Sequence, residues 1–126
     1  MEKALFVLPM TALAVISISS FTATPATAST YVRLSSWIMS HSKEKCIKFA
    51  TEVANITGFT VSQEIVASKE YPSSQFYSYS PNGPFAFAVN CDDKTGTAAF
   101  AVSGINTERT NQLFSEIIRT FKEVSR

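Results

Sequence analysis

The sequence contains few of the residues from which catalytic and metal sites are usually built. It has two cysteines, one histidine and four dispersed glycines among 126 residues. Two cysteines and one histidine cannot complete a four-ligand zinc site, and the cysteines are too far apart to form a Cys-x-x-Cys redox pair. The glycines form no phosphate-binding loop, and no Gly-x-Ser-x-Gly nucleophile elbow occurs. The sequence therefore predicts no cofactor, no metal site and no catalytic residue.

An excess of charge of one sign is also missing. Eleven Lys and Arg residues balance ten Asp and Glu residues, and the basic residues are dispersed along the chain. The local group Lys43, Lys45 and Lys48 is interleaved with Glu44 and Glu52, as on the solvated face of a helix. Proteins that bind nucleic acid or an anionic membrane usually show a basic patch instead. We therefore expect no nucleic-acid partner.

The start of the chain predicts an export signal. A lysine precedes an uncharged apolar run over residues 4–18, and residues 26–28 (Ala-Thr-Ala) have the small-x-small pattern that signal peptidase recognises. A membrane-anchoring helix is the alternative, but the run covers only about fifteen residues, where a span needs about twenty. We therefore expect cleavage of residues 1–28, which leaves a periplasmic or secreted protein that begins at Ser29 and has no membrane anchor.

The remaining residues, 29–126, are enough for one small domain. A domain of this size buries roughly two thirds of the surface that its unfolded chain exposes, so a covalent cross-link contributes noticeably to its stability. Behind an export signal, Cys46 and Cys91 predict a disulfide. Closing a loop of about forty-five residues stabilises the folded state by ~4 kcal/mol in the chain-entropy model.

The spacing of apolar residues predicts two amphipathic helices. Apolar residues recur at helical intervals over 42–57 and again over 107–124. Gly58 follows the first helix where a left-handed cap is needed, and Phe59 supplies the apolar contact that closes such a cap. Trp37 precedes the same helix, and we expect it to pack on the core or on the first helical turns.

Alternation of apolar and polar residues predicts three strands, at 59–65, 85–91 and 97–103. The last two are joined by a polar connection of hairpin length and should pair antiparallel. Residues 31–39 fit a short strand or an arm over the core, because both alternating sets contain apolar residues. Residues 74–80 fit a short edge strand.

These elements predict an α+β fold in the order α-β-(β)-β-β-α. The simplest packing is a two-layer sandwich, in which an antiparallel sheet of three to four strands carries both helices on one face. Cys91, at the end of its strand, can then reach Cys46 on the buried side of the first helix. We therefore expect the disulfide to attach that helix to the sheet.

A series of packing and turn residues precedes the closing amphipathic helix: Trp37, Ser40, Cys46, Gly58, Phe59, Cys91 and Gly104. This series resembles a family of small exported bacterial α+β domains of unknown function. The resemblance covers most of the chain after the export signal. It implies the fold and a single helix-to-strand disulfide, and it implies no activity.

The sole histidine, His41, lacks a recognisable catalytic partner in the sequence. As a general base it would need an acidic partner, and Asp92 or Asp93 reaches it only if the loop after Cys91 folds toward the first helix. The two aspartates lack the alternating oxygen ligands of a calcium loop. Turn chemistry is the simpler interpretation of the aspartates, and a solvated residue or helix cap is the simpler interpretation of His41.

The segment 70–84 has the composition of a protein-binding surface. Aromatic residues are interleaved with small polar ones, as in antibody paratopes, where tyrosines provide contact area at low entropic cost. The candidate binding residues are Tyr71, Phe76, Tyr77, Tyr79 and Asn82. The alternative is that Phe76 and one tyrosine pack inward while the others line the rim of the core.

We therefore expect an exported, non-catalytic protein that binds a protein partner in the cell envelope. Inhibitors, immunity proteins and subunits of envelope complexes are proteins of this type. The alternative is a small periplasmic hydrolase or ligand carrier, whose pocket lies between the helices and the sheet.

Overall fold

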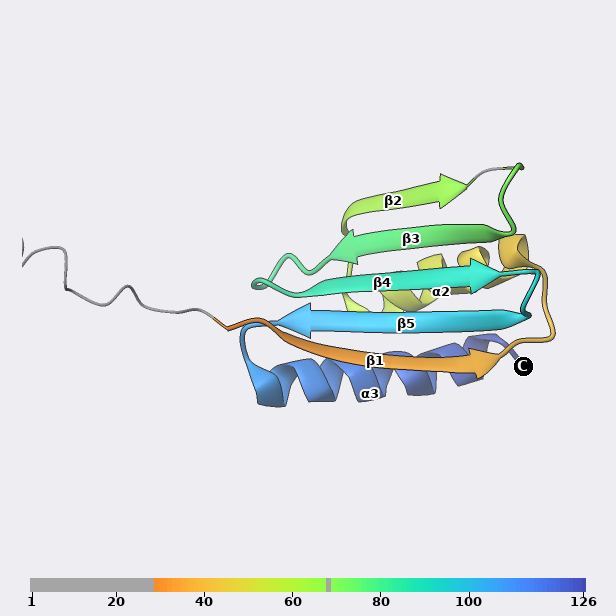
Figure 1. Ribbon diagram of the computed structural model, residues 1–126. Helices are drawn as coiled ribbons and strands as arrows, with labels where there is room; N and C mark the ends of the chain where they lie inside the picture. The colour runs from red at the N-terminus through yellow and green to blue at the C-terminus, as the bar shows by residue number, and fades with distance from the viewer. Residues whose placement is uncertain (1–28, 68) are drawn as a thin grey trace, which may run out of the picture.

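A five-stranded antiparallel sheet with two helices on one face forms the structure, a computed structural model (Figure 1). It describes residues 29–67 and 69–126. The predicted signal peptide, residues 1–28, lies outside the described residues. The elements in chain order are β1 (Tyr31–Ile38), α2 (Lys43–Thr57), β2 (Val61–Ala67), β3 (Ser73–Tyr79), β4 (Ala86–Asp92), β5 (Thr97–Gly104) and α3 (Thr107–Val124).

The strand order in the sheet is β1-β5-β4-β3-β2. Strands β2 to β5 pair with their neighbours in sequence, and β1 pairs with β5 over all eight of its residues. The helix α2 therefore connects the two edges of the sheet, as Figure 1 shows. The α+β class is confirmed. The expected sheet of three to four strands after a first helix is wrong. β1 precedes α2, and the two segments that the sequence left undecided, 31–39 and 74–80, both contain strands.

The two additional strands lack the alternation that marks a half-buried strand. In β1, the register with β5 places Arg33 and Trp37 toward the helices and aliphatic side chains away from them. In β3, the buried side chains are Ser74, Phe76 and Ser78. An arginine and two serines at inward positions conceal the period-two pattern on which strand prediction depends.

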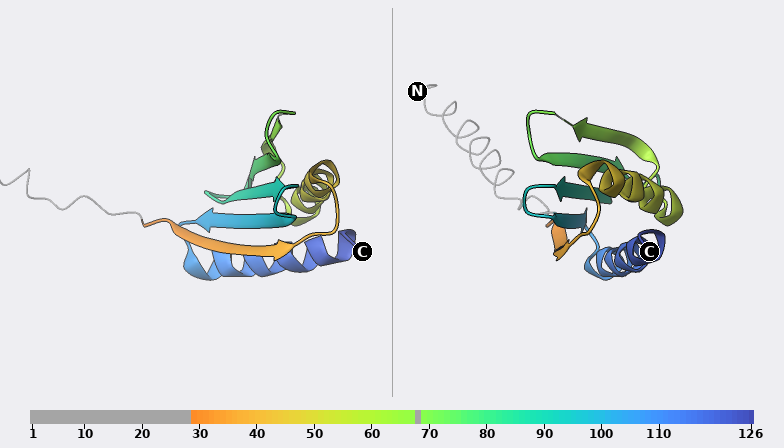
Figure 2. Two further views of the ribbon diagram at one scale, coloured as in Figure 1. Left: turned by 45° about the vertical axis from the view of Figure 1, so that its right-hand side comes forward. Right: turned by 90° about the vertical axis from the view of Figure 1, so that its right-hand side faces the viewer.

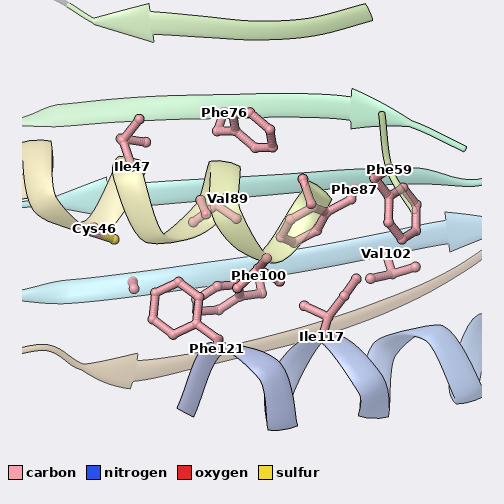
Figure 3. Close-up of a cluster of buried hydrophobic side chains, with 14 of the residues drawn as sticks. Cys46, Ile47, Phe59, Phe76, Phe87, Val89, Phe100, Val102, Ile117 and Phe121 are labelled. Atoms are coloured by element: carbon pink, nitrogen blue, oxygen red, sulfur yellow. The ribbon is translucent and has the colours of Figure 1, made fainter. Parts of the chain in front are cut away.

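The inward side chains of the central strands form the middle of the core, with both helices packed over them (Figure 3). Trp37 from β1 stacks on Phe100, with ring centroids 4.1 Å apart, which confirms that it packs on the core. The fully or almost fully buried hydrophobic residues of the sheet are Phe76, Phe87, Val89, Cys91, Ala98, Phe100 and Val102. Those of the helices are Cys46, Ile47, Ala50, Val53, Ala54, Leu113, Phe114, Ile117 and Phe121.

The helix α2 is capped at both ends, and the cap at its end is the one that its sequence predicts. The Ser42 side chain accepts a hydrogen bond from the Lys45 amide, which satisfies a donor in the first turn. Gly58 has a φ of 89°, in the left-handed region, and its amide donates to the Ala54 carbonyl. Phe59 then turns into the core and is buried. The chain can therefore leave α2 directly toward the edge of the sheet.

The disulfide joins Cys46 in the first turns of α2 to Cys91 near the end of β4, as predicted. Their Cα atoms are 6.1 Å apart, within the usual range for this bond. Both cysteines are buried, so the cross-link lies inside the core. It fixes the start of α2 over the middle of the sheet.

The edge strand β2 departs from its predicted pattern. The alternation of apolar residues places Val61 and Ile65 on one face, but the structure places them on opposite faces. A register shift between Val61 and Glu64 inserts one extra residue, and Ser62 there has a φ of 50°. All seven residues of β2 are exposed, so this strand contributes to the sheet without entering the core.

We expect loss of the disulfide to cost ~4 kcal/mol of the free energy of unfolding, because the cross-link restricts the unfolded chain. The test is denaturant unfolding of the Cys46→Ala/Cys91→Ala variant beside the oxidised protein. The reduced protein serves as the control and should unfold near the variant. Equal stability of the oxidised and reduced proteins would contradict a stabilising cross-link.

Candidate functional site

The helices leave one face of the sheet uncovered among the residues that the structure describes (Figure 2). We call this side the open face. Its centre is built from small side chains, because Ala88 on β4 lies beside Ala101 on β5. Leu34 on β1 lies on the other side of Ala101, and Tyr77 on β3 lies on the other side of Ala88, so the four residues form one row across the sheet. The open face is therefore flat and apolar at its centre, with larger side chains toward both edges.

The predicted binding residues divide between the two faces of the sheet. Tyr77 and Tyr79 alternate with the buried positions of β3 and lie on the open face, where Tyr79 is 49 % exposed. The Tyr77 hydroxyl donates to the side-chain oxygen of Gln75 on the same face. Phe76 is completely buried, so the structure removes it from the predicted surface and places it in the core. Period-two geometry makes this separation unavoidable once 73–79 is a strand.

The other two candidates lie outside the strand, at its opposite ends. Tyr71 precedes β3, is exposed, and its carbonyl accepts a hydrogen bond from the Lys43 ammonium at the start of α2. Asn82 lies in the turn that follows Tyr79, where its backbone N–H donates a hydrogen bond to the Ser80 hydroxyl. Of the five candidates, the structure therefore brings Tyr77, Tyr79 and Asn82 to one region and leaves Tyr71 at the far end.

Sequence reasoning missed the aliphatic part of the open face. Val32, Leu34 and Ile38 on β1 point to this side, and Leu34 is 71 % exposed. Val61 lies there as well, opposite Tyr79. The sequence of β1 did indicate this surface, since apolar residues in both alternating sets are typical of a strand with two apolar faces. Only the pairing with β5 shows which of the two faces stays uncovered.

His41 and the two aspartates do not form a catalytic group. The loop after Cys91 does fold toward α2, but His41 is hydrogen-bonded to the Ser125 carbonyl, at 3.2 Å, and lies edge-on to Phe49. No acidic side chain in the described part of the chain hydrogen-bonds to it. Asp92 accepts from the amides of the turn that follows it. This confirms that turn chemistry accounts for Asp92.

Asp93 caps α2 from across the structure. One of its carboxylate oxygens accepts a hydrogen bond from the Lys43 amide, the first residue of the helix, at 2.6 Å. A carboxylate is favourable there, because it accepts a hydrogen bond from a first-turn amide and faces the positive end of the helix dipole. Because Cys91 is bonded to the same helix, Asp93 and the disulfide together fix the start of α2 on the sheet.

A cleft lies between α2 and the β2 edge, on the side of the sheet that carries the helices. It has a volume of about 690 Å³. Ile47, Ile65 and Ala67 supply its apolar lining, and Lys69 and Asp93 are among the charged residues that also line it. The cleft exists because α2 and α3 together cover only part of the five strands, and β2 extends beyond them.

The residues that the structure describes contain no cluster of three or more His, Cys, Asp or Glu side chains able to hold a metal ion. Within the same residues, neither helix combines the length and apolar character needed to cross a membrane.

No protein-family model matches the chain, and no curated protein has a significantly similar sequence.

We expect Asp93→Ala to lower the free energy of unfolding by about 1 kcal/mol, the usual value of a helix cap. Asp93→Asn should retain most of that stability, because asparagine also accepts the bond from the Lys43 amide. Denaturant unfolding of both variants with the disulfide intact provides the measurement. An equal loss in the two variants would contradict the assignment of the effect to the cap hydrogen bond.

Proposed function

We propose that this protein is an exported protein-binding domain that contacts its partner through the open face of the sheet. The observation that carries the proposal is the uncovered face itself, on which Tyr77 and Tyr79 lie beside an apolar centre of alanines. A disulfide in the core is consistent with export to an oxidising compartment. Export, and membership of the family of small exported bacterial domains, belong to the same proposal.

The side chains of the open face suit a protein partner. Alanines at Ala86, Ala88 and Ala101 allow a partner backbone to approach the sheet closely. Tyr77 and Tyr79 combine large apolar rings with a hydroxyl that can hydrogen-bond, and such residues are enriched among those that dominate binding energy. A partner in the cell envelope, bound by an inhibitor, an immunity protein or a subunit of a complex, would meet this face after export.

The test compares Tyr77→Ala/Tyr79→Ala with Tyr71→Ala. Tyr71 is another exposed aromatic of the same segment, but it lies before the start of β3, at the end of the strand opposite Tyr79, which makes it the control. We expect the double variant to bind a partner recovered from the cell envelope at least ~10-fold more weakly, about 1.4 kcal/mol. Tyr71→Ala should bind as the unmodified protein does.

Thermal unfolding of each variant checks that the comparison reports binding and not folding. A double variant that keeps its melting temperature and its affinity would contradict the role of the open face. Weaker binding by Tyr71→Ala alone would move the binding surface to the opposite end of β3.

A ligand carrier is the second candidate, and the cleft between α2 and β2 favours it. The volume of about 690 Å³ is that of a small-molecule site. Apolar residues from both walls and charged residues around them match an amphiphilic ligand. The hydrolase form of this candidate has no support from His41, which is held by the Ser125 carbonyl.

We expect Ile65→Lys to abolish binding of an amphiphilic fluorescent probe, anilinonaphthalene sulfonate, if the cleft is a ligand site. Val66→Lys is the control, because Val66 is similarly exposed on the same strand but faces the other side of the sheet. Fluorescence titration measures both. Equal probe binding by the two variants would exclude the cleft as the binding site.

A further inference from the structure

One edge of β1 pairs with no strand among the described residues. β1 is the last strand of the sheet, next to β5. Its register with β5 is regular over eight residues, so no bulge interrupts it. The opposite edge is different, because a bulge between Val61 and Glu64 interrupts β2. Bulges of this kind protect an edge from further pairing.

A basic groove runs between the same strand and α3, on the side of the sheet that carries the helices. Its volume is about 330 Å³. Arg33 from β1 and Arg119 and Lys122 from α3 line it, above an apolar floor that includes Phe114 and Ile118. The guanidinium of Arg33 lies over the Phe114 ring, 5.3 Å from its centroid, which holds the cation against α3.

These three cations have no acidic partner among the residues that the structure describes. The ion pair of α3 joins Arg109 to Glu116, with 3.8 Å between the charged atoms, and Glu116 is therefore engaged outside the groove. Three positive charges around one groove repel one another unless an anion lies between them. The groove therefore favours a negatively charged ligand.

The other side of β1 carries the opposite character. Val32, Leu34 and Ile38 point to the open face, and Ile38 is 86 % exposed. A strand that pairs with β1 would alternate in the same way, so one set of its side chains would face the basic groove and the other set would extend this aliphatic row. Both sets of contacts are then satisfied by one extended segment.

We propose that β1 accepts an extended peptide as a sixth strand, with acidic residues at alternate positions facing Arg33, Arg119 and Lys122. Apolar residues at the intervening positions lie beside Val32 and Leu34. Strand addition of this kind takes its affinity from backbone hydrogen bonds and its specificity from alternate side chains. A second copy of the chain is excluded as the occupant, because pairing β1 with β1 would bring two basic grooves together.

Tyr77 and Tyr79 lie too far from β1 to contact this peptide. Leu34 is separated from Tyr77 by Ala101 and Ala88, which is three strand spacings, or roughly 14 Å. The two surfaces can therefore be altered separately. Tyr77→Ala/Tyr79→Ala should leave peptide addition at β1 unchanged.

The test uses a fluorescein-labelled octapeptide of alternating glutamate and valine, titrated with the purified, disulfide-bonded protein and followed by fluorescence anisotropy. We expect saturable binding, and at least ~10-fold weaker binding of the peptide that has lysine in place of glutamate. A version with every backbone amide N-methylated cannot donate to β1 and should lose binding to a similar extent. Hydrogen exchange of the β1 amides should slow when the glutamate peptide binds.

Charge reversal in the protein provides the matched variants. Arg119→Glu/Lys122→Glu removes two groove cations at exposed helix positions and should weaken binding at least ~10-fold. Lys45→Glu/Lys48→Glu changes the net charge equally, also at two exposed helix positions three residues apart but outside the groove, and should change the affinity less than twofold.

Three outcomes would overturn the proposal. Equal effects of the two charge-reversal pairs would show that only net charge matters. Undiminished binding of the N-methylated peptide would show that no strand is added. No binding of the glutamate peptide, with binding of vesicles that contain phosphatidylglycerol instead, would assign the groove to an anionic membrane surface.

Discussion

The burial of large inward side chains on β4 and β5 is the constraint on which the rest of the structure depends. Phe87, Phe100 and their neighbours project from one face of the sheet, and only a second layer can remove them from water. Both helices therefore pack on that face (Figure 3). With just two helices in the described part of the chain, the alanine-rich opposite face stays uncovered, and this is the surface to which we assign partner binding.

The position of α2 follows from two attachments at its beginning. The Cys46–Cys91 bond and the hydrogen bond from the Lys43 amide to Asp93 hold the helix start against the end of β4. The far end of α2 is closed by Gly58 and the buried Phe59. Because α2 is fixed over β3 and β4, it leaves β2 projecting at the side, which creates the cleft lined by Ile47 and Ile65.

The two edges of the sheet have different properties, and their difference organises the surface. β2 is bulged and exposed along its whole length, whereas β1 is regular and has one cation, Arg33, on one side and aliphatic residues on the other. An inward-pointing charge such as Arg33 discourages pairing between identical edges. The same charge, joined by Arg119 and Lys122 from α3, favours an acidic partner strand. One residue can thus exclude self-association and select a ligand.

Local patterns in the sequence determined both helices, the cap at the end of α2, the hairpin of β4 and β5, the disulfide and the structural use of Asp92, because each depends on neighbouring residues or on one covalent bond. The register of β2, the pairing of β1 and the grouping of Arg33 with Arg119 were decided by the tertiary structure. A bulge places Val61 and Ile65 on opposite faces of the sheet without changing the composition of the strand. Which face of a two-sided strand remains in water depends on where the helices pack, and that is a property of the whole core.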